Sequence, residues 1–515
     1  MDDVWTAGKT DIVAGILDGP GQPGAVAMVD GRGRTLTYGE LRRRVRAVAG
    51  AMTGLRPGDG VLFAVRPGPD AVTSALGAVA AGGMLVLADP GLAPEVAAAR
   101  LALTRPRWVV ADALVYALSG PLRRLARRRG LHLPHLREPV PGSAVDHLYA
   151  GPWLPGVPRG ALSLRVLERA PNGAAPTSGS DRDAHVTGKA AGSGQPAVVA
   201  FTSGTTASPR GVVHTRNSLA AGSALFRAAV PLGEGDVVHT DQLMLGLPAL
   251  MAGATWSLPG SRPLADELAA RRATHAFCVP VRLDRALRAN PALPATLRCL
   301  LLGTAPSPPA VLRRARAAAP HADILSVYAM TEALPIAVAS AEQKLACRDG
   351  DLLGPPLPGV SVRIGEDGEL FVSGPQLARG YLGETPLREV ATGDLARLDA
   401  HGRLVLLGRK KDMILRDGVN IYPGLYEPAV AALPGVAEAA IIGVPDPGTG
   451  DEEVVLALVA DEGFDAAAVR RALPDIVDAG ALPDRLALVE AFPRGGRNGK
   501  LDRARLREVI GGARS

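Results

Sequence analysis

Short apolar runs alternate with helical patterns over residues 36–111, and this alternation restricts the chain to a few related folds. Thr37 and Glu40 stand three residues apart, the spacing of a helix capping box, so a helix should follow to about Met52. Strand–helix–strand units of this kind build parallel sheets that helices cover on both faces. The sequence therefore predicts an α/β fold whose first elements are strands at 61–65, 84–88 and 108–111 and helices at 71–81 and 94–103.

The C-terminal part of the chain carries a separate set of predicted elements. Apolar runs predict strands at Val436–Val444 and Glu453–Val459. Asp465 is placed to cap one of the helices that accompany these strands, which are expected at about 428–433, 466–473 and 501–509. A segment of about 100 residues is large enough to fold as its own α+β unit. Before it, residues 354–372 alternate turns with short apolar runs and predict a small β region.

Bulk composition excludes several classes of function. At 515 residues, with 47% hydrophobic and 21% charged residues, the chain fits a soluble globular enzyme with more than one core. The net charge of 57 − 51 = +6 is spread along the chain, so we expect no nucleic-acid partner. The arginine clusters at 42–44 and 123–129 should be solvated helix faces. No apolar run approaches the roughly 20 residues of a membrane span.

Cysteine usage favours a reducing compartment. Cys278, Cys299 and Cys347 are an odd, widely spaced set, which argues against a disulfide scaffold and against a zinc site. The first residues are acidic and show no signal peptide, so a cytoplasmic location is expected. His275 stands three residues before Cys278, but the apolar neighbours of the cysteine favour a buried strand end over a nucleophilic pair.

A polar loop separates two apolar runs, residues 197–201 and 211–214. The loop holds five hydroxyl side chains, the glycine Gly204, a proline and the cation Arg210. Hydroxyl and backbone N–H donors, a close approach at glycine and a positive charge are what a polyphosphate needs. The P-loop pattern does not fit, because Gly204 and Gly211 stand seven residues apart and no lysine follows. A polar surface turn is the alternative interpretation.

Together with this loop, several separated motifs in a fixed order resemble the AMP-forming adenylating superfamily, which includes acyl-CoA synthetases, peptide-synthetase adenylation domains and firefly luciferase. The usual loop is S-G-T-T-G-x-P-K-G-V, and here Ala207 replaces the second glycine and Arg210 the lysine. The resemblance spans about residues 36–506. It implies a large N-terminal domain of layered, mostly parallel sheets with helices and a small β region, followed by a small mobile α+β C-terminal domain.

The resemblance assigns nucleotide-binding roles to three motifs. The β- and γ-phosphates of ATP would be held by the polar loop, through Thr202, Ser203, Gly204, Thr205, Thr206 and Arg210. Adenine would lie beside the turn formed by Gly303, Thr304 and Ala305. A third motif runs from a tyrosine that would stack on adenine to a hydroxyl and a carboxylate that would meet the phosphates and Mg²⁺, namely Tyr328, Ala329, Met330, Thr331 and Glu332. Glu332 and Thr205 are the expected metal ligands.

Four further positions complete the expected site. Asp394 would accept hydrogen bonds from the ribose hydroxyls, with an Asx turn as the alternative role of this residue. Arg409 would reach the nucleotide, and Lys411 would be the hinge about which the C-terminal domain swings. The chain would thus divide into domains at residues 1–410 and 411–515. Lys500 matches the lysine that adenylate formation requires in this superfamily, so the expected catalytic residues are Lys500, Glu332 and Thr205.

These roles predict ATP-dependent activation of a carboxylic or similar acid as its adenylate, with release of pyrophosphate. Transfer to a nucleophile would follow, with the thiol of CoA as the expected acceptor and residues 242–257 lining the acyl pocket. A β-lactone synthetase, an enzyme that loads a carrier protein and a nitrite-activating ligase share the first step and remain alternatives. The replacements Ala207, Arg210, Ala329 and Asn420 would instead suit a non-catalytic nucleotide-binding protein. Residues 171–196 are rich in small and polar side chains and predict a flexible excursion.

Overall fold

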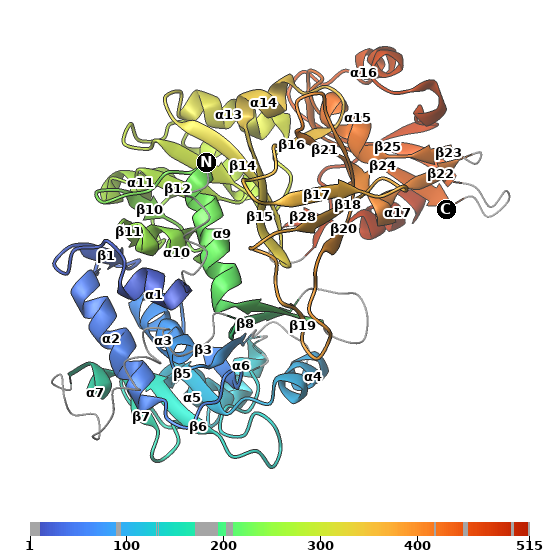
Figure 1. Ribbon diagram of the computed structural model, residues 1–515. Coiled ribbons are helices and arrows are strands. Elements are labelled where there is room, and N and C mark those ends of the chain that lie inside the picture. Colours follow the sequence, from blue (N-terminus) through green and yellow to red (C-terminus); the bar gives the residue numbers. More distant parts are fainter. Residues whose placement is uncertain are drawn as a thin grey trace. The chain divides into compact units, whose positions relative to one another are not determined.

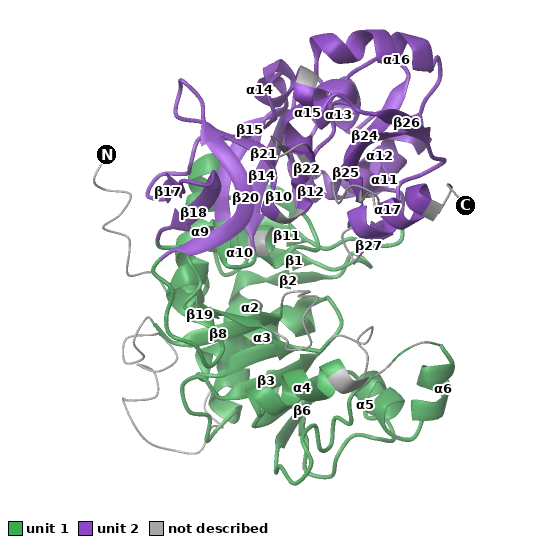
Figure 2. Cartoon of the chain, turned by 90° about the vertical axis from the view of Figure 1, so that its right-hand side faces the viewer, with its two compact units in different colours: residues 1–261, 331–334, 375–388 green, residues 262–330, 335–374, 389–515 purple. Residues whose placement is uncertain are grey.

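The computed structural model describes residues 11–88, 94–129, 131, 133–169, 194–201, 210–416, 419–445, 452–495 and 499–512. The chain divides into two compact units, drawn in two colours in Figure 2. Unit 1 comprises residues 1–261, 331–334 and 375–388, and unit 2 comprises residues 262–330, 335–374 and 389–515. The predicted excursion at 171–196 lies almost wholly outside the described residues. Among the described helices, none is long and apolar enough to cross a membrane.

An eight-stranded sheet forms the centre of unit 1 (Figure 1). Its strands pair in parallel except at one edge, where the last two pairings are antiparallel. In spatial order the strands are β19 (Gly380–Tyr381), β9 (Gly211–Thr215), β8 (Pro196–Phe201), β4 (Met84–Leu87), β3 (Gly60–Ala64), β5 (Trp108–Asp112), β6 (Asp146–Ala150) and β7 (Leu162–Ser163). The predicted α/β fold with mostly parallel strands is confirmed in this unit.

One helix of unit 1 begins at its predicted capping signal. Thr37 and Glu40 form the expected capping box, in which each side chain bonds to the backbone N–H of the other residue. Thr215 and Ser218 form a second capping box at the start of a later helix. The helices among the described residues of this unit, in chain order, are α1 (Ile12–Leu17), α2 (Tyr38–Ala51), α3 (Pro69–Ala80), α4 (Pro94–Thr104), α5 (Ala113–Ser119), α6 (Arg123–Arg128), α7 (Leu164–Arg169), α9 (Arg216–Ala229) and α10 (Leu243–Met251).

Both faces of the large sheet are buried, because side chains along each strand alternate between two cores. Val61 and Val110 belong to a core that includes residues of α2 and α3. Leu62 and Val109 belong to a second core, which includes residues of α4 and α5. A strand that is covered on both faces is apolar throughout, and this explains why β3 and β5 are continuous apolar runs in the sequence.

A smaller group of strands in unit 1 lies on the core that contains α2. It consists of β10 (Val237–His239), β11 (Thr255–Ser257), β1 (Val26–Val29) and β2 (Thr35–Thr37), paired in that order. The buried Trp256 on β11 donates its indole N–H to the carbonyl of Thr240 at 2.9 Å. The segment that was expected to line an acyl pocket, residues 242–257, is formed by α10 and β11 and so belongs to this part of the unit.

Unit 2 contains three parallel strands, β12 (His275–Cys278), β13 (Cys299–Leu302) and β14 (Asp323–Met330). The core beneath them also takes side chains from helices. Cys278 is buried in this core with 8% of its surface exposed, which confirms the predicted packing role. The strand β15 (Ala333–Ser340) follows, and the helices are α11 (Leu264–Arg271), α12 (Pro280–Ala289), α13 (Pro309–Ala318) and α14 (Ala341–Ala346).

An antiparallel sheet of five strands forms the predicted small β region of unit 2. Its strands, in spatial order, are β16 (Asp351–Gly354), β21 (Leu404–Arg409), β20 (Val390–Leu398), β18 (Glu369–Ser373) and β17 (Ser361–Ile364). The pairing of β20 with β21 places Asp394 directly opposite Arg409. Two residues that were singled out separately along the sequence are therefore brought together by the register of one hairpin.

The C-terminal elements confirm the expected α+β composition with two corrections. The predicted strands are observed as β24 (Val436–Pro445) and β25 (Glu452–Ala460), and the capped helix as α16 (Ala466–Ala472). The helix predicted at 428–433 is wrong in its start, because Pro423 is the proline that begins α15 (Pro423–Val430) and Pro428 lies inside it. The helix predicted at 501–509 begins later, because β28 (Lys500–Leu501) pairs with β27 (Arg494–Gly495) before α17 (Arg503–Gly512).

The remaining C-terminal elements are short. They are the 3₁₀ turns η2 (Lys410–Asp412), η3 (Leu473–Asp475) and η4 (Ala479–Ala481), and the strands β22 (Ile414–Arg416), β23 (Val419–Ile421) and β26 (Arg485–Leu488). The strand β26 pairs in parallel with β25, which pairs antiparallel with β24. Each face of the resulting three-stranded sheet is covered by its own hydrophobic core.

Candidate functional site

The strands that flank the polar loop form as predicted. β8 ends at Phe201 and β9 begins at Gly211, and these two residues face each other as the last pair of an antiparallel ladder. The expected phosphate-binding residues of the loop lie outside the described residues, and their role stays a prediction for Thr202, Ser203, Gly204, Thr205 and Thr206. Arg210, at the end of the loop, is described.

Arg210 is held by two neighbours within unit 1. The carbon of its guanidinium lies 3.6 Å from the centre of the Tyr381 ring, and one of its nitrogens lies 3.1 Å from the carboxylate of Glu384. About half of the surface of each side chain in the ion pair is exposed, so the pair contributes little to stability. A guanidinium over an aromatic face is nevertheless well defined in position. The cation that was expected to bind phosphate is thus placed on a tyrosine.

Glu332 is buried, with 7% of its surface exposed. The hydroxyl of Tyr381 donates to its Oε1 at 2.9 Å, and the backbone carbonyl of Glu332 accepts the N–H of Ala378 at 2.7 Å. Burial and then the hydrogen bond to Glu332 raise the pKa of Tyr381 to about 12. The phenol therefore remains a proton donor at neutral pH and fixes one oxygen of the carboxylate. Oε2 has no hydrogen-bond partner among the described residues.

His214 fixes the backbone next to Glu332. Its Nε2 lies 2.7 Å from the carbonyl oxygen of Thr331, and its Nδ1 lies 3.2 Å from the hydroxyl of Ser218. A carbonyl only accepts, so Nε2 carries the proton and Nδ1 is the acceptor. Burial lowers the pKa of His214 below its ordinary value of 6.5, which keeps the imidazole neutral. Thr331 is thus positioned through its main chain.

Asp394 in unit 2 has a comparable arrangement. Only 4% of its surface is exposed, and the hydroxyl of Tyr328 donates to Oδ2 at 2.7 Å. The Nε of Arg409 lies 2.9 Å from Oδ1 as an ion pair. Oδ1 nevertheless has no donor in hydrogen-bonding geometry among the described residues. Burial, and next the charge of Asp394, raise the pKa of Tyr328 well above its ordinary value, so this phenol also remains a donor.

The turn that precedes Asp394 does not use the aspartate side chain. The backbone N–H of Asp394 donates to the hydroxyl of Thr392 at 3.1 Å, and that hydroxyl donates to the carbonyl of Leu370 at 2.8 Å. The N–H of Gly393 donates to Glu369 at 3.0 Å. An Asx turn would require the carboxylate of Asp394 to accept a local backbone N–H. The local turn is made by Thr392 instead, which leaves the carboxylate for Tyr328, Arg409 and a further donor.

The turn after β13 is strained at Thr304. This residue has a φ of +67°, in the left-handed region that β-branched side chains rarely adopt. Its hydroxyl is buried without a hydrogen-bond partner among the described residues. Gly303 and Ala305 flank it, and Gly303 is buried. Strain and an orphaned polar atom at one position are expected where a ligand completes the contacts.

The predicted hinge residue, Lys411, lies between two residues whose side chains form ion pairs with different segments. Lys410 is paired with Asp367 at 2.7 Å and with Glu369 at 2.9 Å, so it is tied to the turn before β18. Asp412, two residues later, lies 3.5 Å from Arg503, whose guanidinium also binds Glu427 at 2.7 Å. Lys411 stands between these anchors, and its side chain is outside the described part of the structure. Its predicted role as the hinge remains a prediction.

Lys500 is the first residue of β28 and is exposed. It faces Gly495 in the two-stranded ladder of β27 with β28. Gly499 before it has a φ of +59°, a conformation that glycine adopts without strain. This tight turn presents the lysine at the beginning of a short strand. Its catalytic role stays a prediction.

The described residues contain no group of three or more His, Cys, Asp or Glu that could hold a metal ion by themselves. Mg²⁺ commonly takes one or two carboxylates and completes its shell with water and substrate phosphates. The free Oε2 of Glu332 supplies one such ligand, so the site fits Mg²⁺ bound together with a polyphosphate. Thr205, the other expected ligand, lies outside the described residues.

Two contributors to the site were missed by sequence reasoning. No role was predicted for Tyr381, and His214 entered only as the end of an apolar run. Each acts through a residue more than 45 positions away in the chain, Tyr381 on Glu332 and His214 on Thr331. The available signals for these two residues were a histidine on a buried strand and a tyrosine that follows a glycine. Neither indicates its partner without the fold.

Comparison with known proteins identifies what this arrangement resembles. A profile of the AMP-binding enzyme family matches residues 19–382, and a profile of the AMP-binding enzyme C-terminal domain matches residues 426–500. A 2-succinylbenzoate–CoA ligase of Listeria monocytogenes is 28% identical over 334 residues, which are 61% of this chain and 70% of that protein. A feruloyl-CoA synthase of an Amycolatopsis species is 29% identical over 480 residues, 85% of this chain and 86% of that one.

Among solved structures, the amide bond synthetase McbA of Marinactinospora thermotolerans superposes with a TM-score of 0.77 at 26% identity. The match covers 97% of this chain and 99% of that one. The fold of nearly the whole chain is therefore shared with a solved amide bond synthetase, and the two profile matches fall within the two predicted domains.

Proposed function

The chain belongs to the AMP-binding enzyme family, and on this premise we propose that it activates a carboxylic acid with ATP and transfers the acyl group to CoA. The acid attacks the α-phosphorus of ATP, the bond to the leaving pyrophosphate breaks, and an acyl adenylate forms. The thiol of CoA then displaces AMP. The family match and the CoA ligases among the relatives, one of which aligns with 85% of this chain, support this assignment.

We assign the nucleoside of ATP to the residues of unit 2. Asp394 would accept the ribose hydroxyls through Oδ1, the oxygen that Tyr328 leaves without a hydrogen bond. Arg409 would approach the phosphates from its position beside that carboxylate. The strained turn at Thr304 would lie beside adenine, where its orphaned hydroxyl could bind the base. Tyr328, with its hydroxyl fixed by Asp394, would offer its ring as a stacking face.

We assign the phosphates to the residues of unit 1. Glu332 would hold Mg²⁺ through Oε2, and the bound ion would neutralise negative charge on the phosphate oxygens. Tyr381 would orient the carboxylate by its hydrogen bond to Oε1. Arg210 would leave Tyr381 and Glu384 to pair with a phosphate, for which its planar fork is suited. The loop residues Thr202 to Thr206 would supply the remaining donors.

The reacting groups are two anions, and Lys500 would bring them together. Its ammonium would bridge the incoming carboxylate and the α-phosphate, which lowers their repulsion and stabilises the charge that develops during attack. Rotation about Lys411 would then remove Lys500 and admit the thiol. The anchoring of Lys410 on one side and Asp412 on the other supports a hinge confined to this residue.

A single observation carries the proposal. Asp394 is a buried carboxylate that stands at the family position expected for ribose. One of its oxygens is bound by Tyr328, and the other lies 2.9 Å from the Nε of Arg409 but has no donor in hydrogen-bonding geometry among the described residues. A buried acceptor without a donor is unfavourable unless a ligand completes it. A nucleoside hydroxyl would do so.

The direct test is a screen of carboxylic acids with purified protein, ATP and Mg²⁺, following pyrophosphate and AMP with and without CoA. The proposal predicts acid-dependent pyrophosphate release for at least one acid and a thioester when CoA is present. Pyrophosphate without a thioester would replace CoA by another acceptor. ATP binding without pyrophosphate release for any acid would favour a non-catalytic nucleotide-binding protein.

An amine is the acceptor with the best support after CoA, because the structure of an amide bond synthetase matches nearly the whole chain. A carrier protein, an internal hydroxyl that closes a β-lactone, and nitrite as the activated anion remain further possibilities for the same first step. Repeating the acid screen with a panel of amines in place of CoA separates the amide product from the thioester. We further propose a cytoplasmic location, in keeping with the sparse cysteines.

A further inference from the structure

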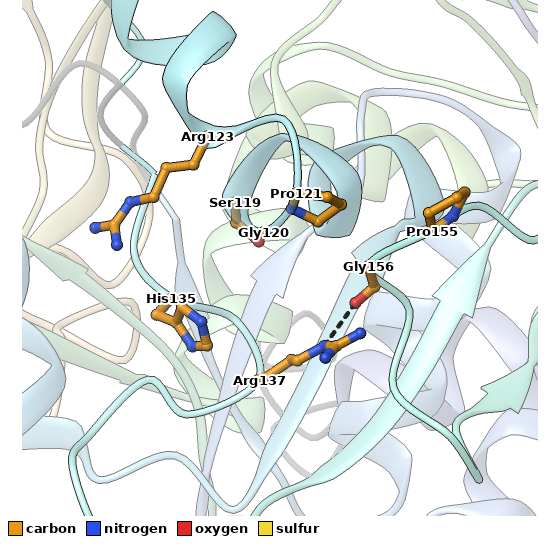
Figure 3. Close-up of a pocket in the computed structure, with 8 residues that line it drawn as sticks. All are labelled: Ser119, Gly120, Pro121, Arg123, His135, Arg137, Pro155 and Gly156. Atoms are coloured by element: carbon orange, nitrogen blue, oxygen red, sulfur yellow. Dashed lines mark hydrogen bonds between the residues drawn. The ribbon is translucent and has the colours of Figure 1, made fainter.

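A hollow in unit 1 is lined by none of the residues assigned to ATP. Its volume is about 530 Å³, and its walls come from three segments (Figure 3). The end of α5 and the start of α6 contribute Ser119, Gly120, Pro121 and Arg123, the segment before β6 contributes His135 and Arg137, and the loop after β6 contributes Pro155 and Gly156. A volume of this size lies in the range of pockets for small molecules.

The polar lining of the hollow is cationic. Arg123, His135 and Arg137 carry the charged or ionisable groups of the lining, and no acidic residue belongs to it. The Nε of Arg123 is buried without a hydrogen-bond partner among the described residues. The nearest acid in sequence, Glu138, uses its Oε1 to accept the N–H of Gly142 at 2.7 Å, so it is engaged in its own turn.

Arg137 is aimed by a fixed carbonyl. Its Nε donates to the carbonyl oxygen of Gly156 at 3.0 Å, a bond drawn in Figure 3. Gly156 has a φ of +114°, and a Cβ at this position would lie 2.7 Å from the carbonyl oxygen of Tyr116. Only glycine fits there, so the carbonyl that holds Arg137 is set by the backbone. The two Nη atoms of Arg137 have no partner among the described residues.

The surroundings strengthen the positive charge. Between Ala113 and Arg137 the chain contains no aspartate or glutamate and six arginines, which are Arg123, Arg124, Arg127, Arg128, Arg129 and Arg137. None of the six forms an ion pair with another described residue. The prediction of a solvated helix face holds for most of α6, whose arginines are exposed apart from the half-buried Arg123. Clustered unpaired cations focus their field on anions in solution.

We propose that this hollow binds a small organic phosphate. Two guanidinium groups and an imidazole supply donors for the oxygens of a doubly charged tetrahedral anion. The rings of Pro121 and Pro155 give the same hollow an apolar wall, which suits the organic part of a phosphate ester. Arginine forks match both carboxylate and phosphate, but two guanidinium groups compensate the charge of a doubly charged phosphate, so the ligand class is phosphate rather than a singly charged carboxylate such as acetate.

Thermal unfolding of the full chain tests this site, with inorganic phosphate as the probe and acetate at equal ionic strength as the comparison. The proposal predicts a rise in the unfolding midpoint with phosphate and a smaller rise with acetate. In Arg123→Gln and Arg137→Gln the apparent phosphate affinity should fall by about 10-fold or more. Arg123→Gln is the cleaner change, because this side chain makes no hydrogen bond that the fold needs.

Arg124→Gln is the matched control, since Arg124 is an exposed neighbour on α6 that does not line the hollow. It should retain the wild-type response to phosphate. An equal loss in Arg124→Gln would mean a diffuse basic surface and would overturn the proposal, as would the absence of any response to phosphate in the wild type. Residual binding in Arg123→Gln measures phosphate at the ATP-binding residues, so the difference between variants isolates the hollow.

Two further measurements separate this proposal from others. Pyrophosphate release without added phosphate should be unchanged in Arg123→Gln, and its absence in the wild type would refute the proposed ligase function without touching the phosphate site. Phosphatidylserine vesicles test the exposed Leu122, Leu125 and Arg124 as a lipid-binding face. The proposal would be overturned if the protein bound vesicles equally well in Arg123→Gln and did not respond to free phosphate. That result would assign the binding to the exposed face instead of the hollow.

Discussion

Each unit has a tyrosine whose hydroxyl donates to a buried candidate carboxylate, and the difference between these two pairs is informative. In unit 2 the hydroxyl of Tyr328 donates to the buried Asp394 at 2.7 Å, and in unit 1 the hydroxyl of Tyr381 donates to the buried Glu332 at 2.9 Å. Asp394 also has the cation Arg409 within 2.9 Å. Glu332 has no cation within ion-pair distance among the described residues.

This difference suits the two carboxylates to different ligands. The charge of Asp394 is already compensated by Arg409, so its un-hydrogen-bonded oxygen is suited to the neutral hydroxyls of a sugar. Glu332 is buried with its charge uncompensated, an unfavourable state that a bound cation would relieve. Arg210 contacts the ring of Tyr381, the tyrosine that binds Glu332, and does not pair with Glu332 itself. Under the proposed function, Tyr328 would hold a carboxylate for ribose and Tyr381 would hold one for a metal ion.

The largest expected effect is that of Lys500→Ala. This substitution tests whether the enzyme can form the adenylate when Asp394 and Glu332 are intact but the bridging ammonium is removed. Acid-dependent pyrophosphate release should fall by about 10²- to 10³-fold, the usual cost of removing a preorganised donor from a developing charge. Arg505→Gln, which changes an exposed cation on α17, should leave the rate unaltered. An unchanged rate in Lys500→Ala would remove this lysine from the mechanism.

The next effect concerns the ribose end. In Asp394→Asn the KM for ATP should rise by about 10- to 100-fold, because hydrogen bonds to a charged acceptor are lost together with the partner of Tyr328. Steady-state kinetics with varied ATP measures this. Asp399→Asn removes another arginine-paired aspartate, bound by Arg403 at 2.7 Å, and serves as the control. Equal effects of the two substitutions would show that Asp394 acts only through the stability of the sheet.

Tyr381→Phe tests the metal end with a smaller expected effect. Loss of the bond to Oε1 should raise the Mg²⁺ concentration that gives half of the maximal rate by about 5-fold. The reason is that one neutral hydrogen bond that orients the carboxylate is removed. The matched control is Tyr426→Phe, which deletes a similar bond from a tyrosine to Asp478 at 2.8 Å. The Mg²⁺ concentration that gives half of the maximal rate should shift only in Tyr381→Phe, and a shift in both variants would contradict the orienting role.

The smallest effect is on stability in acid. The pKa of His214 is lowered by burial, so the unfolded chain binds a proton at a higher pH than the folded chain. Its contribution is therefore complete above pH 6.5 and is lost as the pH falls below that value. The unfolding temperature, measured by circular dichroism, should decrease less between pH 7 and pH 5 in His214→Asn than in the wild type.

His321→Asn changes an exposed histidine and should retain the acid sensitivity of the wild type. His275 is also buried, and burial lowers its pKa to about 4, so part of the acid sensitivity will remain in His214→Asn. An acid response in His214→Asn as large as that of the wild type would mean that the proton uptake on unfolding takes place elsewhere.

Much of the fold could be predicted from the sequence because its signals are local. The continuous apolar runs of β3 and β5 and the capping box of Thr37 with Glu40 depend on neighbouring residues alone. The start of α15 was missed because two prolines, Pro423 and Pro428, both satisfy the preference for the first turn of a helix, and local rules do not choose between them.

The site was predictable only in part. Motif order in the resemblance located Tyr328, Asp394 and Glu332 as single residues, but the pairs they form depend on strand register and on contacts between distant segments. The opposition of Asp394 and Arg409 follows from the β20–β21 hairpin. The partnership of Tyr381 with Glu332 goes with contacts between the segment before β19 and the segment around Glu332, where the N–H of Ala378 donates to the carbonyl of Glu332. Neither can be read from spacing along the chain.

A titration of Mg²⁺ at saturating ATP, run side by side on Glu332→Gln and Asp394→Asn, tests the division of labour between the two carboxylates most directly. We predict that the Mg²⁺ concentration for half of the maximal pyrophosphate release rises by about 10-fold or more in Glu332→Gln, where a charged ligand is lost. The same midpoint should be unchanged in Asp394→Asn. A shift in Asp394→Asn with none in Glu332→Gln would contradict the assignment.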